Sequence, residues 1–152
     1  MADDEAVMDE NQKFQQSLMY LETLKSQLET ITQQQEYMAM AEMEHTQARD
    51  TIQKFQDLKQ GEELLVPIGA ESMIFSTVTD KPKVIINIGA KYSVEQNFED
   101  AIITLGKRID RIRENQQKLD QSAAGLRQQA EMLTLEVQEM YRKMTQQPGQ
   151  LL

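Results

Sequence analysis

A seven-residue repeat of apolar side chains runs through the last third of the chain. From Phe98 to Met144 the steps between its members alternate strictly between four and three residues, and Gln116 is the one polar member. The members are Phe98, Ile102, Leu105, Ile109, Ile112, Gln116, Leu119, Ala123, Leu126, Ala130, Leu133, Val137, Met140 and Met144. Such a repeat keeps a narrow apolar seam on one side of a helix, and the seam demands a partner helix. We therefore expect a coiled-coil helix over residues 97–145, with Asn97 as its N-cap and Pro148-Gly149 as its stop.

A second seam precedes it, with less regular spacing. Its predicted members are Phe14, Leu18, Leu21, Leu24, Leu28, Ile31, Gln35, Met38, Ala41, His45, Ala48, Ile52 and Phe55. Two consecutive steps of three occur at Leu18–Leu24 and at Gln35–Ala41, which predicts local overwinding. The expected helix covers about residues 11–59 and ends at a Gly61 cap. Because the two predicted helices are equally long, we expect them to fold back on each other as an antiparallel hairpin, with both chain ends at its far tip.

Residues 62–96 break the helical pattern. They are rich in Val, Ile and aromatics, and Gly and Pro divide them into four expected strands, at 63–68, 72–78, 83–88 and 92–96. Two successive β-hairpins follow, whose open edges we expect to pair with strands of other subunits. The residues expected at this oligomer interface are Leu65, Val66, Ile74, Phe75, Val84, Ile86, Ile88 and Val94. The predicted fold is mainly α with a small β module, in one domain over residues 1–152.

Composition excludes several classes of function. The net charge is -9, which opposes binding to nucleic acid. The basic residues Lys107, Arg108, Arg111 and Arg113 are interleaved with acidic ones, as on a solvated helix face. There is no run of 18 apolar residues, so we expect no membrane span. The absence of Cys rules out disulfides and fits a cytoplasmic location.

Residues suited to catalysis or cofactor binding are scarce. Glu42 and His45 have the spacing found in di-iron helical bundles, but such sites need a second His motif and the chain has a single His. Gln35, His45 and Gln116, in seam positions, are better explained as register-setting residues. There is no phosphate-binding Gly loop and no pairing of a nucleophile with a base. We expect no catalytic residue, no cofactor and no metal, and a helical metal enzyme is the least favoured alternative.

The β region carries a resemblance to a known family. The segments "ELLVPIGAESMIFSTV" and "DKPKVIINIGAKYSVEQNFEDAI", between two long helices, resemble an archaeal prefoldin subunit of the alpha type, which has two hairpins where the beta type has one. The resemblance implies a hexamer of two alpha-type and four beta-type subunits, whose strands form a double β-barrel carrying six coiled coils. It further implies an ATP-independent holdase that captures unfolded proteins between its tips and delivers them to a group II chaperonin. The alternative is a structural coiled-coil scaffold or tether assembled through its hairpins.

Apolar residues outside the seams point independently to a binding surface. Met132, Leu135 and Tyr141 lie off the seam near the predicted tip, and the fold-back brings Met19 and Tyr20 to the same region. Exposed apolar side chains often mark binding sites, and Met adapts to varied partners. We therefore expect these five residues to bind unfolded clients. Packing against a neighbouring stalk, or a frayed end, would explain them as well. A further off-seam group in mid-stalk has no assigned role: Tyr37, Met40 and Met43.

Overall fold

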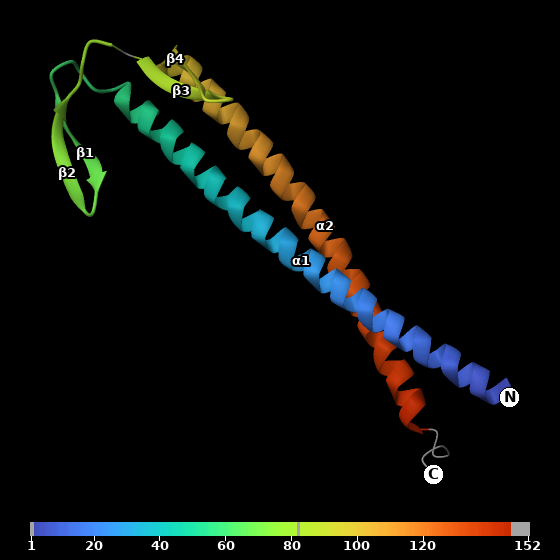
Figure 1. Cartoon of the computed structure of the whole chain (residues 1–152). Coiled ribbons are helices and arrows are strands. Elements are labelled where there is room, and N and C mark those ends of the chain that lie inside the picture. The colour runs from blue at the N-terminus through green and yellow to red at the C-terminus, as the bar shows by residue number, and fades with distance from the viewer. Residues whose placement is uncertain (1, 82, 147–152) are drawn as a thin grey trace. The chain divides into compact units, whose positions relative to one another are not determined.

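Along the chain, two short β-hairpins lie between two long helices. The structure, a computed structural model, describes residues 2–81 and 83–146, with the backbone alone for residues 2–8. The elements are α1 (Ala2–Phe55), β1 (Glu63–Gly69), β2 (Ser72–Thr77), β3 (Lys83–Gly89), β4 (Tyr92–Asn97) and α2 (Phe98–Gln146), labelled in Figure 1. The prediction of two long helices joined by two antiparallel β-hairpins is confirmed.

The chain divides into two compact units, and each contains a part of both helices. The hairpin unit is Ala39–Glu114, and the terminal unit is Met1–Met38 with Asn115–Leu152. In the terminal unit Gln35 Nε2 donates a hydrogen bond to Asp120 Oδ1 at 2.6 Å, and the rings of Phe14 and Tyr141 stack. These two pairs lie 21 residues apart on each helix, which shows antiparallel packing in a single register. In the hairpin unit, Arg113 forms an ion pair with Glu42 at 2.6 Å.

The helix ends show how the sequence starts and stops each helix. Asn97 Oδ1 accepts a hydrogen bond from the Asp100 backbone N–H at 2.7 Å, so the predicted N-cap of α2 is confirmed. Pro148 and Gly149, its expected stop, lie outside the described residues. α1 ends at Phe55, four residues before the expected position. Gly61 has a φ of 86°, but its N–H bonds to the Val78 carbonyl at 2.9 Å, so it begins the first hairpin instead of capping the helix.

Burial along the helices shows which residues form the seams. On α2 every predicted member from Phe98 to Met140 is buried or half-buried, and Ile109 is fully buried, but the last predicted member, Met144, is exposed. On α1 two predicted members are exposed, Leu18 and Ala48, and the half-buried positions beside them are Ser17 and Arg49. With Ser17, the steps from Phe14 to Leu28 alternate regularly between three and four residues. The overwinding predicted at Leu18–Leu24 is therefore wrong, because Leu18 does not belong to the seam.

The two hairpins are structural repeats of each other, offset by 20 residues. Leu65 pairs with Phe75 in the first, and Ile85 pairs with Glu95 in the second; all the other cross-strand pairs correspond in the same way. Each strand pair has a register shift just before its turn, after Pro67 and after Asn87. The turn residues Ala70, Glu71, Ala90 and Lys91 all have positive φ. Two consecutive positive φ values are typical of the type I′ turn, whose twist matches that of the strands.

The second hairpin packs on the helices of its own unit. Ile52 of α1, Ile86 of β3 and Ala101 with Leu105 of α2 form a buried cluster, and Val84, Phe98 and Ile102 pack against it. Two hydrogen bonds add to this contact. Arg108 Nη2 donates to the Asn87 carbonyl at 2.5 Å, and Thr104 Oγ1 donates to Gln96 Oε1 at 3.1 Å. The hairpin β3–β4 is therefore held to α2 by both apolar packing and polar contacts.

Candidate functional site

The predicted oligomer-interface residues differ in how much surface they leave open. Leu65, Val66, Ile74 and Phe75 of β1–β2 are all exposed, and Phe75 has 76% of its surface open. On β3–β4, Ile88 is exposed, whereas Val84 and Val94 are half-buried. An isolated two-stranded hairpin is marginally stable in water, because it buries little apolar surface. The open apolar surface of this module therefore lies mainly on β1–β2.

Ile86 departs from the expectation of an interface position. Its side chain is 5% exposed and packs against Ala101 and Leu105 of the same chain. Strand alternation puts Ile86 on the face that α2 covers, so almost none of its surface is left for another subunit. The same alternation turns its neighbour Ile85 outward, with 73% of its surface exposed. We therefore remove Ile86 from the candidate interface.

Sequence reasoning missed several exposed apolar residues in the same module. They are Ile68, Met73, Ile85 and Tyr92, and all are more than half exposed. The 20-residue repeat would have indicated one of them, because Ile68 occupies in the first hairpin the position of Ile88 in the second. Met73 lies beside Phe75 on the same face, two residues away along β2. The exposed apolar surface of β1–β2 is thus larger than predicted.

The five predicted client-binding residues all lie in the terminal unit, and all are exposed. They are Met19, Tyr20, Met132, Leu135 and Tyr141, with exposures between 53% and 71%. Met19 lies two residues from both Ser17 and Leu21, so it faces away from the seam of α1. Leu135 has the same relation to Leu133 and Val137 on α2. Met19 and Leu135 therefore each project from the side of their helix that faces away from the seam.

Tyr141 has a partner within the chain. Its ring lies 6.4 Å from that of Phe14, centroid to centroid, at an interplanar angle of 30°. This offset stack joins α1 to α2 and leaves most of the Tyr141 side chain open. Next to Phe14 in the sequence, Lys13 Nζ donates a hydrogen bond to Asp9 Oδ2 at 2.6 Å, and this hydrogen bond raises the pKa of Lys13 above its ordinary value. The terminal unit therefore contains an aromatic contact between the helices and an ion pair within α1, beside its exposed apolar residues.

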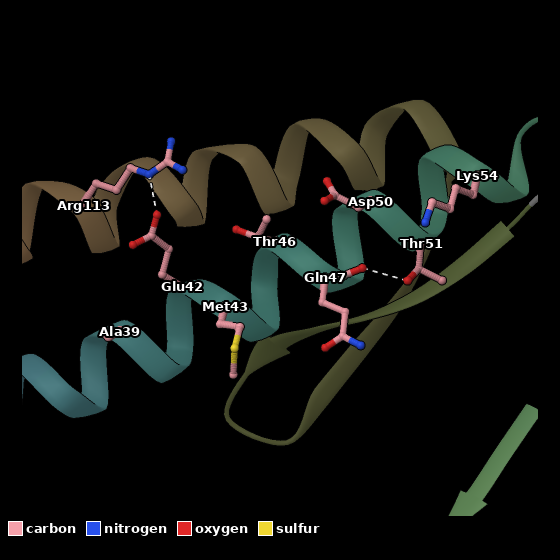
Figure 2. A pocket seen from close by; sticks show the side chains of 9 residues that line it. All are labelled: Ala39, Glu42, Met43, Thr46, Gln47, Asp50, Thr51, Lys54 and Arg113. Atoms are coloured by element: carbon pink, nitrogen blue, oxygen red, sulfur yellow. Dashed lines mark hydrogen bonds and ion pairs between the residues drawn. The ribbon is translucent and has the colours of Figure 1, made fainter.

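The mid-stalk residues Tyr37, Met40 and Met43 are also exposed. Met43 lines a shallow pocket of about 630 Å³ in the hairpin unit, which Figure 2 shows along α1 between Ala39 and Lys54. The dashed line between Arg113 and Glu42 in Figure 2 marks the ion pair at one end of this pocket. Its remaining lining is a mixture of Thr, Gln, Asp and Lys side chains. The pocket is therefore open to solvent and lined by both polar and apolar side chains.

The motif considered for metal binding serves a structural role. His45 Nδ1 donates a hydrogen bond to the Ala41 carbonyl at 2.7 Å, and Glu42 is paired with Arg113. Within residues 2–81 and 83–146, no three His, Cys, Asp or Glu side chains lie close enough together to hold a metal ion. In the same part of the chain, no helix is long and apolar enough to cross a membrane.

Comparison with known proteins agrees with this architecture. Residues 24–143 match the family model described as prefoldin subunit. The prefoldin subunit alpha of Methanoculleus marisnigri is 34% identical over 133 residues, which cover 87% of this chain and 89% of that protein. The prefoldin subunit alpha of Pyrococcus horikoshii is 29% identical over 138 residues, which cover 90% of this chain and 93% of that protein.

Solved structures share the fold. A filamentous PFD from Methanocaldococcus jannaschii superposes with a TM-score of 0.66 at 22% identity, covering 78% of this chain and 98% of that one. The prefoldin beta subunit from Thermococcus strain KS-1 gives a TM-score of 0.56 at 18% identity, covering 84% and 90%. Together with the two hairpins and the paired helices, these matches show that the chain belongs to the prefoldin family of chaperone subunits, in its alpha type.

Proposed function

We propose that the chain is one subunit of an ATP-independent holdase, a hexamer of two alpha-type and four beta-type subunits acting in the cytoplasm. In this assembly the hairpins join the subunits, and the terminal units bind unfolded proteins before delivery to a group II chaperonin. The exposed apolar residues of the terminal unit carry this proposal. A scaffold or tether would need the helices and hairpins, but it would have no need of Met19 and Leu135 facing solvent.

The arrangement of these residues suggests how binding would work. Met19 and Leu135 face away from their seams, so each offers an exposed apolar side chain to a binding partner. A single contact of this kind is weak. An unfolded protein that touches several subunits at once gains affinity through effective concentration, without any new contact. Flexible Met side chains fit such varied partners.

The test combines this chain with a beta-type prefoldin subunit. Native mass measurement should detect a hexamer with two copies of this chain. Light scattering should then show less aggregation when a denatured client is diluted into the hexamer without nucleotide, and transfer to a group II chaperonin with ATP should restore client activity. A hexamer that leaves client aggregation unchanged would favour the scaffold.

A further inference from the structure

The side of α2 opposite its seam carries a pair of adjacent apolar side chains in the terminal unit. Met132 and Leu135 are three residues apart, a spacing that brings the Cβ atoms of two helix residues to within about 5–6 Å. Both side chains are more than half exposed. Leu133 and Val137, on the other side of the same turns, are half-buried in the seam. Met132 and Leu135 therefore form one small apolar surface that is turned away from α1.

Three glutamates border this apolar pair. Glu131 precedes Leu135 by four residues, and Glu139 follows it by four. Glu136 follows Met132 by four. Residues four apart are neighbours on one side of a helix, so each of these carboxylate side chains lies one turn from an apolar one. All three glutamates are exposed, and residues 128–141 contain no Lys or Arg. This face is therefore apolar at its centre and acidic around it.

Two of the three carboxylates are available to a cation of a binding partner. Glu139 has cations of its own helix beside it, Arg142 at 3.9 Å and Lys143 at 3.7 Å. Among the described side chains, no cation lies within ion-pair distance of Glu131 or Glu136. A bound Lys or Arg would therefore meet these two carboxylates without displacing an existing ion pair.

The charge of the terminal unit reinforces this local pattern. Residues 1–38 and 115–152 contain 12 acidic and 6 basic residues. Arg127, four residues before the first of the three glutamates, lines a shallow pocket together with Glu29 and Glu36 of α1, so acidic side chains of the other helix compete for its charge. A surface with a net negative field attracts cationic partners and repels anionic ones.

We propose that this acidic-bordered face, residues 131–139 of α2, selects unfolded segments in which Lys or Arg stands next to apolar residues. The aliphatic stem of a Lys or Arg side chain can lie on Met132 and Leu135 while its charged end reaches Glu131 or Glu136. Apolar residues beside it extend the contact. Basic segments of this kind are typical of nucleic-acid-binding proteins. The inference rests on the proposed function and names the class of client that this chain prefers.

The size of the acidic-bordered face favours a short extended segment as its occupant. Nine helical residues rise about 12 Å, and an extended chain covers this length with about four residues. So small an area binds weakly, as expected for a client that is held through several subunits at once. Each ion pair at an exposed position changes affinity by a factor of about 1.4 to 5, so charge selects among clients without binding any of them tightly.

The test reads binding at this face directly, through a single introduced thiol. The sequence has no Cys, so Gln128→Cys, at an exposed position one turn before Met132, can be labelled with benzophenone maleimide before assembly with a beta-type subunit. The probes are three unstructured peptides with identical apolar residues and with Lys, Gln or Glu at all other positions. At low salt, photo-crosslinking of the Lys peptide should be about fivefold stronger than that of the Gln peptide, and that of the Glu peptide about fivefold weaker. High salt should reduce both differences to less than about twofold.

Two controls separate selection at this face from general attraction by the acidic complex. Gln117→Cys places the same label on the same side of α2, about three turns away, and should discriminate less than about twofold. In the chain labelled at position 128, Glu131→Gln with Glu136→Gln should bring the Lys and Gln peptides to within about twofold of each other. Asp110→Asn with Glu114→Gln removes the same charge from exposed positions of α2 in the hairpin unit, and it should leave the preference unchanged.

The outcomes distinguish this inference from the proposed function. Equal crosslinking of the Lys and Gln peptides, by a complex that suppresses client aggregation, overturns the inference alone. A preference that survives the loss of the Glu131 and Glu136 charges also overturns it, because selection would then belong to the whole complex. Crosslinking of a folded basic protein as strong as that of the Lys peptide overturns it too, since the face would then recognise a folded partner. A complex that leaves client aggregation unchanged overturns the proposed function, and with it the client role of this face.

Discussion

Ile85 and Ile86 are sequence neighbours with opposite surroundings. Ile86 is buried against α2, whereas Ile85 projects from the other face of the same strand. Both have the same side chain and the same strand propensity, so the difference between them is purely one of environment. They form a matched pair for measuring what the contact between β3–β4 and the helices contributes to stability.

Ile86→Ser should lower the free energy of unfolding of the isolated chain by about 3 kcal/mol or more, since it leaves a cavity and places a hydroxyl in an apolar cluster. Ile85→Ser should change it by less than about 0.5 kcal/mol. Urea unfolding followed by circular dichroism at high dilution measures both. Similar losses for the two variants would contradict the packing of Ile86 on Ala101 and Leu105.

Substitutions in the turn of β3–β4 should increase stability, whereas Ile86→Ser should decrease it. Ala90 and Lys91 have φ values of 48° and 66°, a left-handed conformation that costs about 1 kcal/mol for residues other than Gly, Asn and Asp. Replacing this pair by Asn-Gly, the preferred type I′ sequence, should raise the free energy of unfolding of the isolated chain by about 1 kcal/mol.

The same replacement at Ala70-Glu71 is the control. The hairpin β1–β2 is exposed along both strands, so its local stability should contribute little to unfolding of the dilute chain. The two double variants are compared in urea at equal concentration. A larger stabilisation at Ala70-Glu71 than at Ala90-Lys91 would mean that β1–β2, and not β3–β4, is the hairpin coupled to the helices.

At the scale of the elements, the seam of α2 could be predicted from the sequence almost completely, and the seam of α1 could not. On α2 the predicted members from Phe98 to Met140 are all buried or half-buried. On α1 the prediction placed the apolar Leu18 in the seam, but its neighbour Ser17 occupies that position. Helix geometry decides which residue faces the partner helix, whether or not that residue is apolar. Arg49 is similar. Its aliphatic stem can lie along the seam while its guanidinium bonds to Asp50.

The residues of the α2 seam differ in how deeply they are buried, so their substitution should cost different amounts of stability. Ile109 is fully buried and Ile112 is half-buried. Ile109→Ala should therefore cost about 2–4 kcal/mol of stability, and Ile112→Ala should cost less. Lys118→Ala, at an exposed position on the same helix, should have little effect. Thermal unfolding of the three variants at matched concentration checks the order, and equal shifts in Tm would refute the register of α2.

At the scale of the whole molecule, the order of elements and the two-hairpin module followed from sequence pattern, but the unequal burial of the hairpins did not. Val66 and Ile86 occupy equivalent positions and have similar side chains, yet Val66 is exposed and Ile86 is buried. Only the tertiary contact with Ala101 and Leu105 distinguishes them. The client-binding residues stay a prediction for the same reason, since their exposure in one chain is compatible with more than one partner.

Replacing all five client-binding candidates by Ser should leave the hexamer intact and weaken client protection. Met19, Tyr20, Met132 and Leu135 lie off the seam, and Tyr141 contributes one exposed aromatic stack. Small losses on separate subunits multiply when they act on one unfolded chain, so protection should fall by more than a single substitution suggests. Light scattering of a refolding client at matched hexamer concentration measures the loss.

The mid-stalk group provides the matched control for this variant. Tyr37, Met40 and Met43 are also exposed, and the triple Ser variant removes a comparable apolar surface elsewhere on the helices. Protection that survives the fivefold change but is lost with the triple change would transfer the binding role to this group.

The open apolar faces of β1–β2 also have a consequence for supply in the cell. A copy of this chain without partners presents Leu65, Phe75 and Met73 as exposed side chains on a two-stranded hairpin, and such a surface promotes aggregation and proteolysis. Synthesis in excess of the partner subunit would therefore produce surplus chains that are cleared or precipitate, so the partner's abundance sets the amount of this chain that persists. Under the proposed function, this chain would itself need protection between translation and assembly.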